Sequence, residues 1–215
     1  MSNPVIFKLS LSKVDGRLDP IATQPIVQLL RDKFRNSPFP VKALHWLVDF
    51  KKSITKDINA GDVYVGLENI DGTTGDYVPT VAKESIGSAA IFERGDILFP
   101  KLRPYLNKTY EAEFDGLCST EFHVLRAHGA SAAYITAVLR SDVAVRLMSF
   151  LMTGNTLPRL QTADIEQMEI PLPPTHIQDE IVNKLSGSKA EIRALNATAA
   201  KFLDKTRDEG VRIFV

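Results

Sequence analysis

The sequence predicts an α/β (α+β) fold, in which a compact, mostly antiparallel or barrel-like sheet domain with helices precedes a long C-terminal coiled-coil helix. Short β-rich runs separated by turn residues occupy positions 62–125 and indicate the sheet. Apolar residues recur at helical spacing over 132–152, and a heptad pattern spans 181–202. We expect an N-terminal segment over 1–19, the domain over 20–174, the long helix over 175–209 and a tail over 210–215.

The first elements of the domain are expected to be helical. Apolar residues between Pro20 and Phe34 follow a roughly helical period, which predicts one helix there. A second, short helix is expected after Pro40, with Leu44, Leu47 and Val48 facing the core.

Five short strands are expected next, at 63–65, 77–78, 89–92, 97–99 and 122–125. Their close spacing favours an antiparallel or barrel-like sheet. Pro100 and Pro104 are interruptions that a central strand would not tolerate, so the segment 95–108 is expected at an edge or in a loop. A broad apolar face over 132–152 then predicts helix packed on the core.

The long C-terminal helix carries a seam of residues at alternating intervals of four and three. The seam consists of Ile181, Leu185, Ser188, Ile192, Leu195, Ala199 and Phe202, and Gly210 is suited to end the helix. About 35 residues would extend about 50 Å, longer than a domain of this size needs to cover its own core. The helix is therefore expected to pack on another long helix, through all seam positions except Ser188. An amphipathic helix folded back on its own domain is the alternative.

Composition places few limits on function. The 215 residues are 44% hydrophobic and 24% charged, with zero net charge, as in ordinary soluble globular proteins. No apolar run suits a membrane span, no leader opens the chain, and the lone Cys118 excludes an internal disulfide, so we expect a cytoplasmic protein. Residues 31–56 carry seven Lys or Arg against two Asp, and 94–108 carry four against one. A fold that joins these two basic stretches could engage phosphates, although unrelated solvated faces would look the same.

Sequence signals for catalysis are absent. The four histidines lack metal-ligand spacing, and neither a Gly-rich cofactor turn nor a phosphate loop occurs, so we expect no metal and no cofactor. Asp96, Asp115 and Glu121 could in principle form a nuclease site, but the expected nearby Lys is missing. Cys118 is expected to be a small core residue.

Two segments are candidates for nucleic-acid contact. Lys101, Arg103 and Lys108 lie close together around Tyr105, and cations on a stiff loop beside an aromatic suit a nucleic-acid backbone. A solvated loop is the plainer interpretation. In the second segment, residues 153–160, Asn155 and Arg159 could reach phosphates or bases, but a structural lock to the start of the long helix, with Leu157 and Leu160 buried, is favoured.

Several motifs in order resemble those of a known family. They are Tyr64-Val-Gly-Leu-Glu-Asn-Ile70 with Thr74-Gly75, Gly95-Asp-Ile-Leu-Phe-Pro-Lys-Leu-Arg-Pro-Tyr-Leu-Asn-Lys108, Gly116-Leu-Cys-Ser-Thr-Glu-Phe-His-Val-Leu125, Thr153-Gly-Asn-Thr-Leu-Pro-Arg-Leu160 and Ile170-Pro-Leu-Pro-Pro174 with Gln178. Together, over roughly residues 40–205, they resemble the specificity subunit of Type I restriction-modification systems. The resemblance implies that 20–174 is a DNA target recognition domain and 175–209 a spacer and dimerisation helix.

That family implies a function without catalysis. Its members read a split double-stranded DNA site and direct an adenine methyltransferase subunit, on which S-adenosylmethionine is expected, and in some systems a restriction (translocase/endonuclease) subunit. Full-length members carry two recognition domains and two long antiparallel helices, whereas this chain has one of each. If it is a half-subunit and not a fragment of a longer protein, its helix is expected to pair with its own copy in a homodimer that reads an inverted repeat, or with a second, different half-subunit. Motif residues would grip the DNA backbone, and bases would be read by other loops, such as 68–79. The alternative is an assembly protein that does not bind DNA.

Overall fold

The structure, a computed structural model, describes residues 23–59, 61–79, 86–154 and 158–212, with side chains up to residue 203. The predicted N-terminal segment 1–19 and the last three residues of the predicted tail lie outside this part. The α-helices are α1 (Pro25–Arg35), α2 (Ala132–Leu139), α3 (Asp142–Leu151), α4 (Thr162–Glu166) and α5 (Thr175–Arg212). The 3₁₀ turns are η2 (Leu44–Trp46), η3 (Leu67–Asn69) and η4 (Pro104–Leu106). The strands are β1 (Val41–Ala43), β2 (Val48–Lys51), β3 (Ile54–Thr55), β4 (Tyr64–Val65), β5 (Ala89–Phe92), β6 (Ile97–Pro100), β7 (Tyr110–Glu111), β8 (Gly116–Cys118), β9 (Phe122–Ala127) and β10 (Glu169–Pro171).

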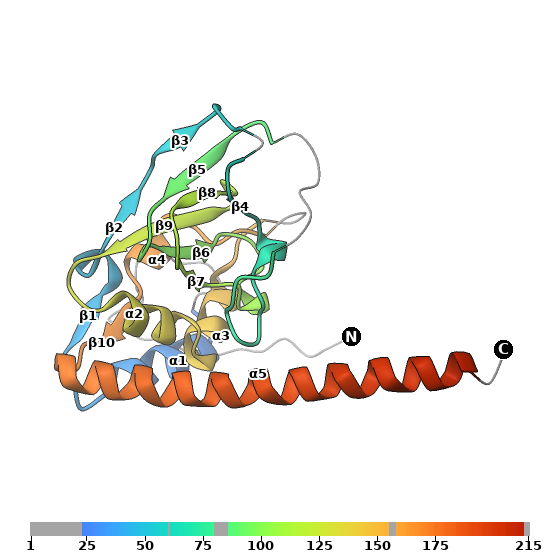
Figure 1. Cartoon of the computed structure of the whole chain (residues 1–215). Coiled ribbons are helices and arrows are strands. Elements are labelled where there is room, and N and C mark those ends of the chain that lie inside the picture. Colours follow the sequence, from blue (N-terminus) through green and yellow to red (C-terminus); the bar gives the residue numbers. More distant parts are fainter. Residues whose placement is uncertain (1–22, 60, 80–85, 155–157, 213–215) are drawn as a thin grey trace, which may run out of the picture.

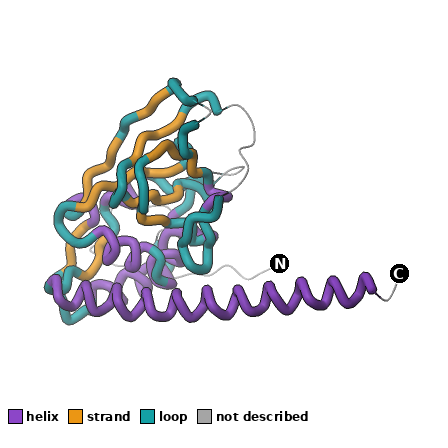
Figure 2. Tube along the Cα trace, in the orientation of Figure 1, coloured by secondary structure: helices purple, strands orange, loops and turns teal. Residues whose placement is uncertain are grey.

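Two four-stranded sheets form the centre of the domain (Figures 1 and 2). One has the antiparallel order β2-β9-β6-β7, and the other has the order β3-β5-β8-β4, in which only the β4 and β8 pair is parallel. Strands β1 and β10 make a separate antiparallel pair. The expectation of a compact, mostly antiparallel α/β domain followed by a long helix is confirmed.

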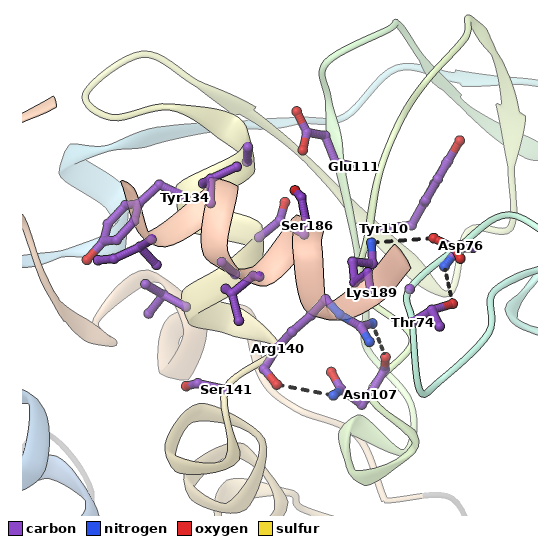
Figure 3. Close-up of a pocket in the computed structure, with 18 of the residues that line it drawn as sticks. Thr74, Asp76, Asn107, Tyr110, Glu111, Tyr134, Arg140, Ser141, Ser186 and Lys189 are labelled. Atoms are coloured by element: carbon purple, nitrogen blue, oxygen red, sulfur yellow. Dashed lines mark hydrogen bonds and ion pairs between the residues drawn. The ribbon is translucent and has the colours of Figure 1, made fainter. Parts of the chain in front are cut away.

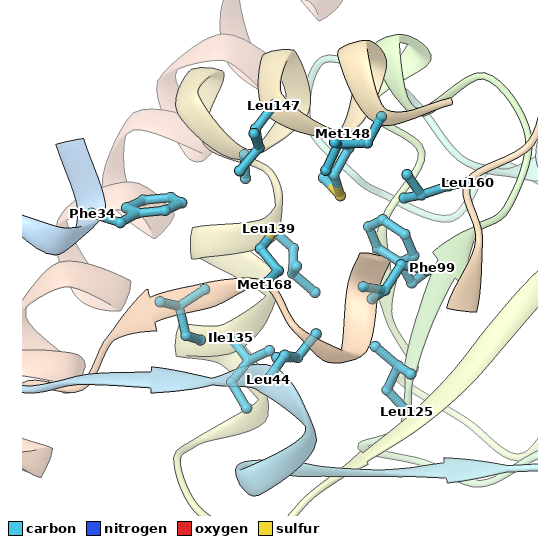
Figure 4. Packing of buried hydrophobic residues seen from close by; sticks show 14 of the residues in the cluster. Phe34, Leu44, Phe99, Leu125, Ile135, Leu139, Leu147, Met148, Leu160 and Met168 are labelled. Carbon is cyan, nitrogen blue, oxygen red and sulfur yellow. The ribbon is translucent and has the colours of Figure 1, made fainter. Parts of the chain in front are cut away.

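The β2-β9-β6-β7 sheet is a central layer because both its faces are covered. Side chains alternate along β6, so that Ile97 and Phe99 point to the helices while Leu98 points to the second sheet. The helical side is the larger core, where α1, α2 and α3 supply Phe34, Leu139 and Met148 among others (Figure 4). The chain thus folds as two sheets and one helical layer.

The structure corrects several sequence-based expectations. The segment after Pro40 is strand, 3₁₀ turn and strand instead of a helix, although Leu44, Leu47 and Val48 are buried as predicted. Pro100 is the last residue of β6, although β6 is an interior strand. Because β7 pairs only with Ile97 and Leu98, no β7 carbonyl oxygen needs a hydrogen bond from the N–H that Pro100 lacks. Residues 132–152 form two helices, α2 and α3, because Ser141 caps the start of α3.

Helix α5 runs beneath the helical layer, and its C-terminal part extends beyond the domain (Figure 1). The helix continues to Arg212, two residues past Gly210, at which its end was expected. Gln178, only 4% exposed, fixes its first turns by accepting from the Ser131 N–H and donating to the Pro173 carbonyl. Farther along, Arg193 makes two hydrogen bonds to Asp76, at 2.7 and 2.5 Å. The first half of α5 therefore lies along its own domain, as in the alternative interpretation.

Candidate nucleic-acid interface

Two basic stretches of the sequence meet at one edge of the central sheet. Strands β2 and β6 both run antiparallel to β9, so both end beside the start of β9. Lys52 follows the end of β2, and Lys101 follows the end of β6. Between them lies His123, whose pKa falls to about 4 because burial and then the charges of Lys101 and Lys52 oppose its protonation. We call Lys51, Lys52, Lys101, Arg103 and Arg159 the cation edge.

Two of the predicted phosphate-binding lysines have protein partners. The Lys101 ammonium donates to the Thr120 carbonyl oxygen at 2.6 Å, and burial lowers its pKa. The Lys108 ammonium donates to the Ile70 carbonyl oxygen at 2.7 Å. Both therefore tie loops distant in sequence to the segment after β6. This is a structural role that the sequence analysis did not assign to them.

Arg103 and Tyr105 are the accessible members of the same segment. Arg103 adopts the left-handed conformation, with φ 48°, immediately before η4, and its side chain is exposed. Within the described part of the chain, no hydrogen bond or ion pair engages its guanidinium group. Tyr105 is 54% exposed. These two side chains are free to meet a ligand at the cation edge.

The segment 153–160 is anchored to the same edge. Thr153 and Arg159 pair through two backbone hydrogen bonds, and the Leu160 N–H donates to the Lys101 carbonyl at 3.0 Å. Arg159 also pairs with Glu121 at 2.6 Å. Leu160 is buried, as predicted, but the segment locks onto the end of β6 instead of the start of α5. Asn155 and Leu157 lie outside the described residues.

The turn at 71–76 packs against α2 and α5, within the loop 68–79 suggested for base reading. Arg140 donates to the carbonyl oxygens of Gly72 and Thr73, both at 3.0 Å. Figure 3 shows its further hydrogen bonds with Asn107. Gly75 has φ +73°, and a Cβ there would lie 2.7 Å from the guanidinium carbon of Arg140. Sequence reasoning missed Arg140, since a cation at a helix end is common.

Groups that could support catalysis are already engaged. Asp96, 1% exposed, accepts two hydrogen bonds from Arg126, at 2.8 and 2.9 Å. Asp115 accepts from the Arg94 N–H, and Glu121 pairs with Arg159. Burial raises the pKa of Cys118 to about 12. Among the described residues, no group of three or more His, Cys, Asp or Glu could hold a metal ion.

Comparisons with known proteins agree on one family. The model of the Type I restriction modification DNA specificity domain matches residues 46–200. The Type I restriction enzyme EcoDI specificity subunit of Escherichia coli is 23% identical over 164 residues, which are 71% of this chain and 37% of that protein. In the part of the chain that the structure describes, no helix combines the length and apolar character needed to cross a membrane.

Solved structures show the same fold. A chain whose structure addresses complex assembly and conformational transition of the type I R-M system is 25% identical, with a TM-score of 0.61 over 77% of this chain and 46% of that one. The HsdS subunit from Thermoanaerobacter tengcongensis is 26% identical, with a TM-score of 0.61 over 76% and 45%. The chain therefore spans less than half the length of each of these relatives.

Proposed function

Because this chain belongs to the family of Type I restriction modification DNA specificity domains, whose members are specificity subunits and not enzymes, we propose that it reads one half of a split DNA site. In this proposal the domain binds double-stranded DNA and delivers partner subunits to it. The chain itself performs no chemistry.

The convergence of basic stretches at the cation edge supports this proposal most directly. Separated in sequence by an acidic stretch, the ends of β2 and β6 bring cations together on either side of β9. Phosphate contacts of this kind supply affinity and orientation without sequence information. In this proposal, Arg103 binds a phosphate of the DNA backbone, and the Tyr105 ring stacks next to that contact. Lys101 and Lys108 hold the supporting loops, while Arg159 keeps the segment that carries Asn155 in place.

The partners follow from the same family membership. An adenine methyltransferase subunit, which binds S-adenosylmethionine, is the proposed catalytic partner, and a restriction subunit is a second one. Helix α5 extends beyond the domain and offers the seam for a homodimer, so that two copies read an inverted repeat. We place this complex in the cytoplasm, where the DNA is.

Binding of a labelled duplex of about 30 base pairs, measured by fluorescence anisotropy over a salt series, tests the DNA-binding proposal. The double substitution of Lys52 and Arg103 by Ala removes two exposed cations whose side chains make no hydrogen bond to the described residues. We expect weaker binding to every sequence, and a slope of log K against log salt that is flatter by about 1.8.

Lys33→Ala is the matched control, because Lys33 is an exposed cation on α1, away from the cation edge. It should leave affinity and salt slope nearly unchanged. Unaltered binding by the double variant would refute the role of the cation edge. A protein that dimerises but binds no duplex even at low salt would instead support the alternative of an assembly protein.

A further inference from the structure

A cavity of about 760 Å³ separates the first half of α5 from the domain (Figure 3). Its walls come from α5, from α2, from β7 and from the turn at 71–76. The contacts of Gln178 and of Arg193 attach α5 to the domain before and after this space. The volume is typical of pockets that hold small molecules, and no residue of the cation edge lines it.

The two helices supply most of the hydrocarbon surface of the cavity. Ala133, Thr136 and Ala137 lie at helical spacing on the face of α2 that lines it. On the other side, α5 contributes Leu185 and Ile192 among others. The cavity can therefore hold the hydrocarbon part of a ligand between two helices.

Two buried oxygen atoms of the lining residues have no hydrogen-bond partner among the described residues. Thr136 is 9% exposed, and its hydroxyl oxygen is unpartnered. The side-chain oxygen of Asn107 is also buried and unpartnered. Buried polar groups nearly always make a hydrogen bond, so these oxygens indicate that a donor group is missing from the cavity.

The remaining wall and the rim are charged. The charged lining residues are Asp76, Arg94, Glu111, Glu113, Arg140 and Lys189. Asp76 pairs with Lys189 and with Arg193, and the Arg140 guanidinium group is bound to backbone carbonyl oxygens. Arg94 and Glu113 are exposed to solvent. Glu111 differs from these residues, because it is half-buried and, within the described part of the chain, no hydrogen bond or ion pair engages its carboxylate.

Strand β7 directs Glu111 toward the helical layer. Glu111 pairs across the sheet with Ile97, whose side chain belongs to the helical core, and residues directly opposite each other point to the same face. Burial raises the pKa of Glu111, while the charges of Lys189 and Glu113 act on it in opposite directions. A carboxylate that is partly removed from water and lacks a donor favours the approach of a cation.

We propose that this cavity binds a small organic amine, whose ammonium group pairs with Glu111 and whose hydrocarbon part lies between Ala137 and Leu185. The Thr136 hydroxyl is a further acceptor for the bound amine. The charge of Glu111 disfavours an anion, and an uncharged ligand would leave its carboxylate unpaired. Because the walls belong both to α5 and to the domain, the bound amine also stabilises the attachment of α5. This site is separate from the cation edge and does not depend on DNA recognition.

Three probes with the same hydrocarbon chain, hexylamine, hexanol and hexanoate, test the proposal on the full chain. Their affinities are measured by chemical-shift titration of isotope-labelled protein at neutral pH. Hexylamine should bind more tightly than hexanol by about tenfold, because only the amine gains a charge-assisted hydrogen bond. Hexanoate should bind more weakly than hexanol. Equal affinities for hexylamine and hexanol, or no binding of hexylamine at millimolar concentrations, would overturn the proposal.

Glu111→Gln keeps the shape of the side chain and removes its charge. This variant should bind hexylamine about tenfold more weakly and lose the preference over hexanol. Glu113→Gln is the matched control, because it removes a neighbouring but exposed carboxylate, and it should change the affinity by less than about twofold. An unchanged affinity of Glu111→Gln for hexylamine would refute the pairing, whatever other variants show.

Two further variants test the location of the hydrocarbon part. Ala137→Leu reduces the cavity from α2, and Ser188→Leu reduces it from α5 at an exposed position, where the fold tolerates a larger side chain. Each variant that retains the native circular dichroism spectrum should bind hexylamine and hexanol more weakly. Undiminished binding of both probes by Ser188→Leu would place the ligand outside this cavity.

Discussion

Arg140 joins three parts of the domain, and its replacement provides a sharp test of the structure. Its guanidinium group donates to four backbone carbonyl oxygens: those of Asn107 at 2.6 Å, Thr109 at 3.1 Å, and Gly72 and Thr73 at 3.0 Å. In return, the Asn107 amide donates to the Arg140 carbonyl at 3.1 Å. Burial lowers the pKa of Arg140, because removal from water disfavours the charged guanidinium group. The four carbonyl acceptors offset this desolvation cost and keep the group charged.

The expected loss of stability follows from these contacts. A hydrogen bond from a charged donor contributes a net of about 1.5–3 kcal/mol. The four hydrogen bonds share one charge, so their contributions to stability are not additive. Water can also enter the cavity that Arg140 lines and solvate the freed carbonyl oxygens. We expect Arg140→Ala to lower the free energy of unfolding by about 3 kcal/mol. For a chain of this length, that corresponds to a decrease in Tm of about 6–12 °C.

Urea unfolding followed by circular dichroism measures this change. Arg140→Lys should cost about 2 kcal/mol, because a single ammonium group cannot span both sets of carbonyls. Arg146→Ala, which removes an exposed Arg paired with Asp142 on the same helix, should cost less than about 0.5 kcal/mol. If Arg140→Ala were as stable as Arg146→Ala, the assignment of Arg140 as the link between α2 and the turn at 71–76 would be wrong.

Two further predictions concern pH and a buried ion pair. Because the folded-state pKa of His123 is about 4, below the ordinary 6.5, the unfolded state binds more protons between these values, and the free energy of unfolding should fall by about 3 kcal/mol as pH drops from 6.5 to 4. His123→Phe should remove this part of the slope in urea titrations at several pH values, whereas substitution of the exposed His176 by Gln should not. Arg126→Met leaves the buried Asp96 carboxylate with one donor among the described residues, the Glu93 N–H, and should cost about 2–4 kcal/mol. Adding Asp96→Leu should restore part of that loss in the same unfolding assay, and a larger loss in the double variant would contradict the explanation.

The parts of the fold that could be predicted from the sequence are those with a periodic apolar pattern. The helices around Leu30, Leu139 and Leu147 each bury a repeating face, and the long helix α5 carries a heptad seam, so their spacing reveals them. Strands β3 and β7 have two residues each, too few to show any period. They exist because neighbouring strands pair with them, which is information that lies elsewhere in the chain.

The candidate site was predictable in composition but not in arrangement. Clustered cations marked the segment of Lys101, Arg103 and Lys108, yet their roles depend on partners 19 and 38 residues away. Only the fold shows that Thr120 and Ile70 offer their carbonyl oxygens to the two lysines, leaving Arg103 exposed. Charge in a sequence locates possible contacts, whereas tertiary pairing decides which of them remain available.

The double attachment of α5 has a consequence for the geometry of the DNA that two copies could read. Gln178 and Arg193 are 15 residues apart, or about 22 Å along the axis, so the helix cannot pivot on its domain. Two domains joined through such helices can change their separation only by sliding the seam, and a seam accepts steps of whole heptads. One step is about 10.5 Å, close to the rise of three base pairs at 3.4 Å each. Half-site spacing would therefore be quantised in units of about three base pairs, and a target with intermediate spacing would be rejected whatever its sequence.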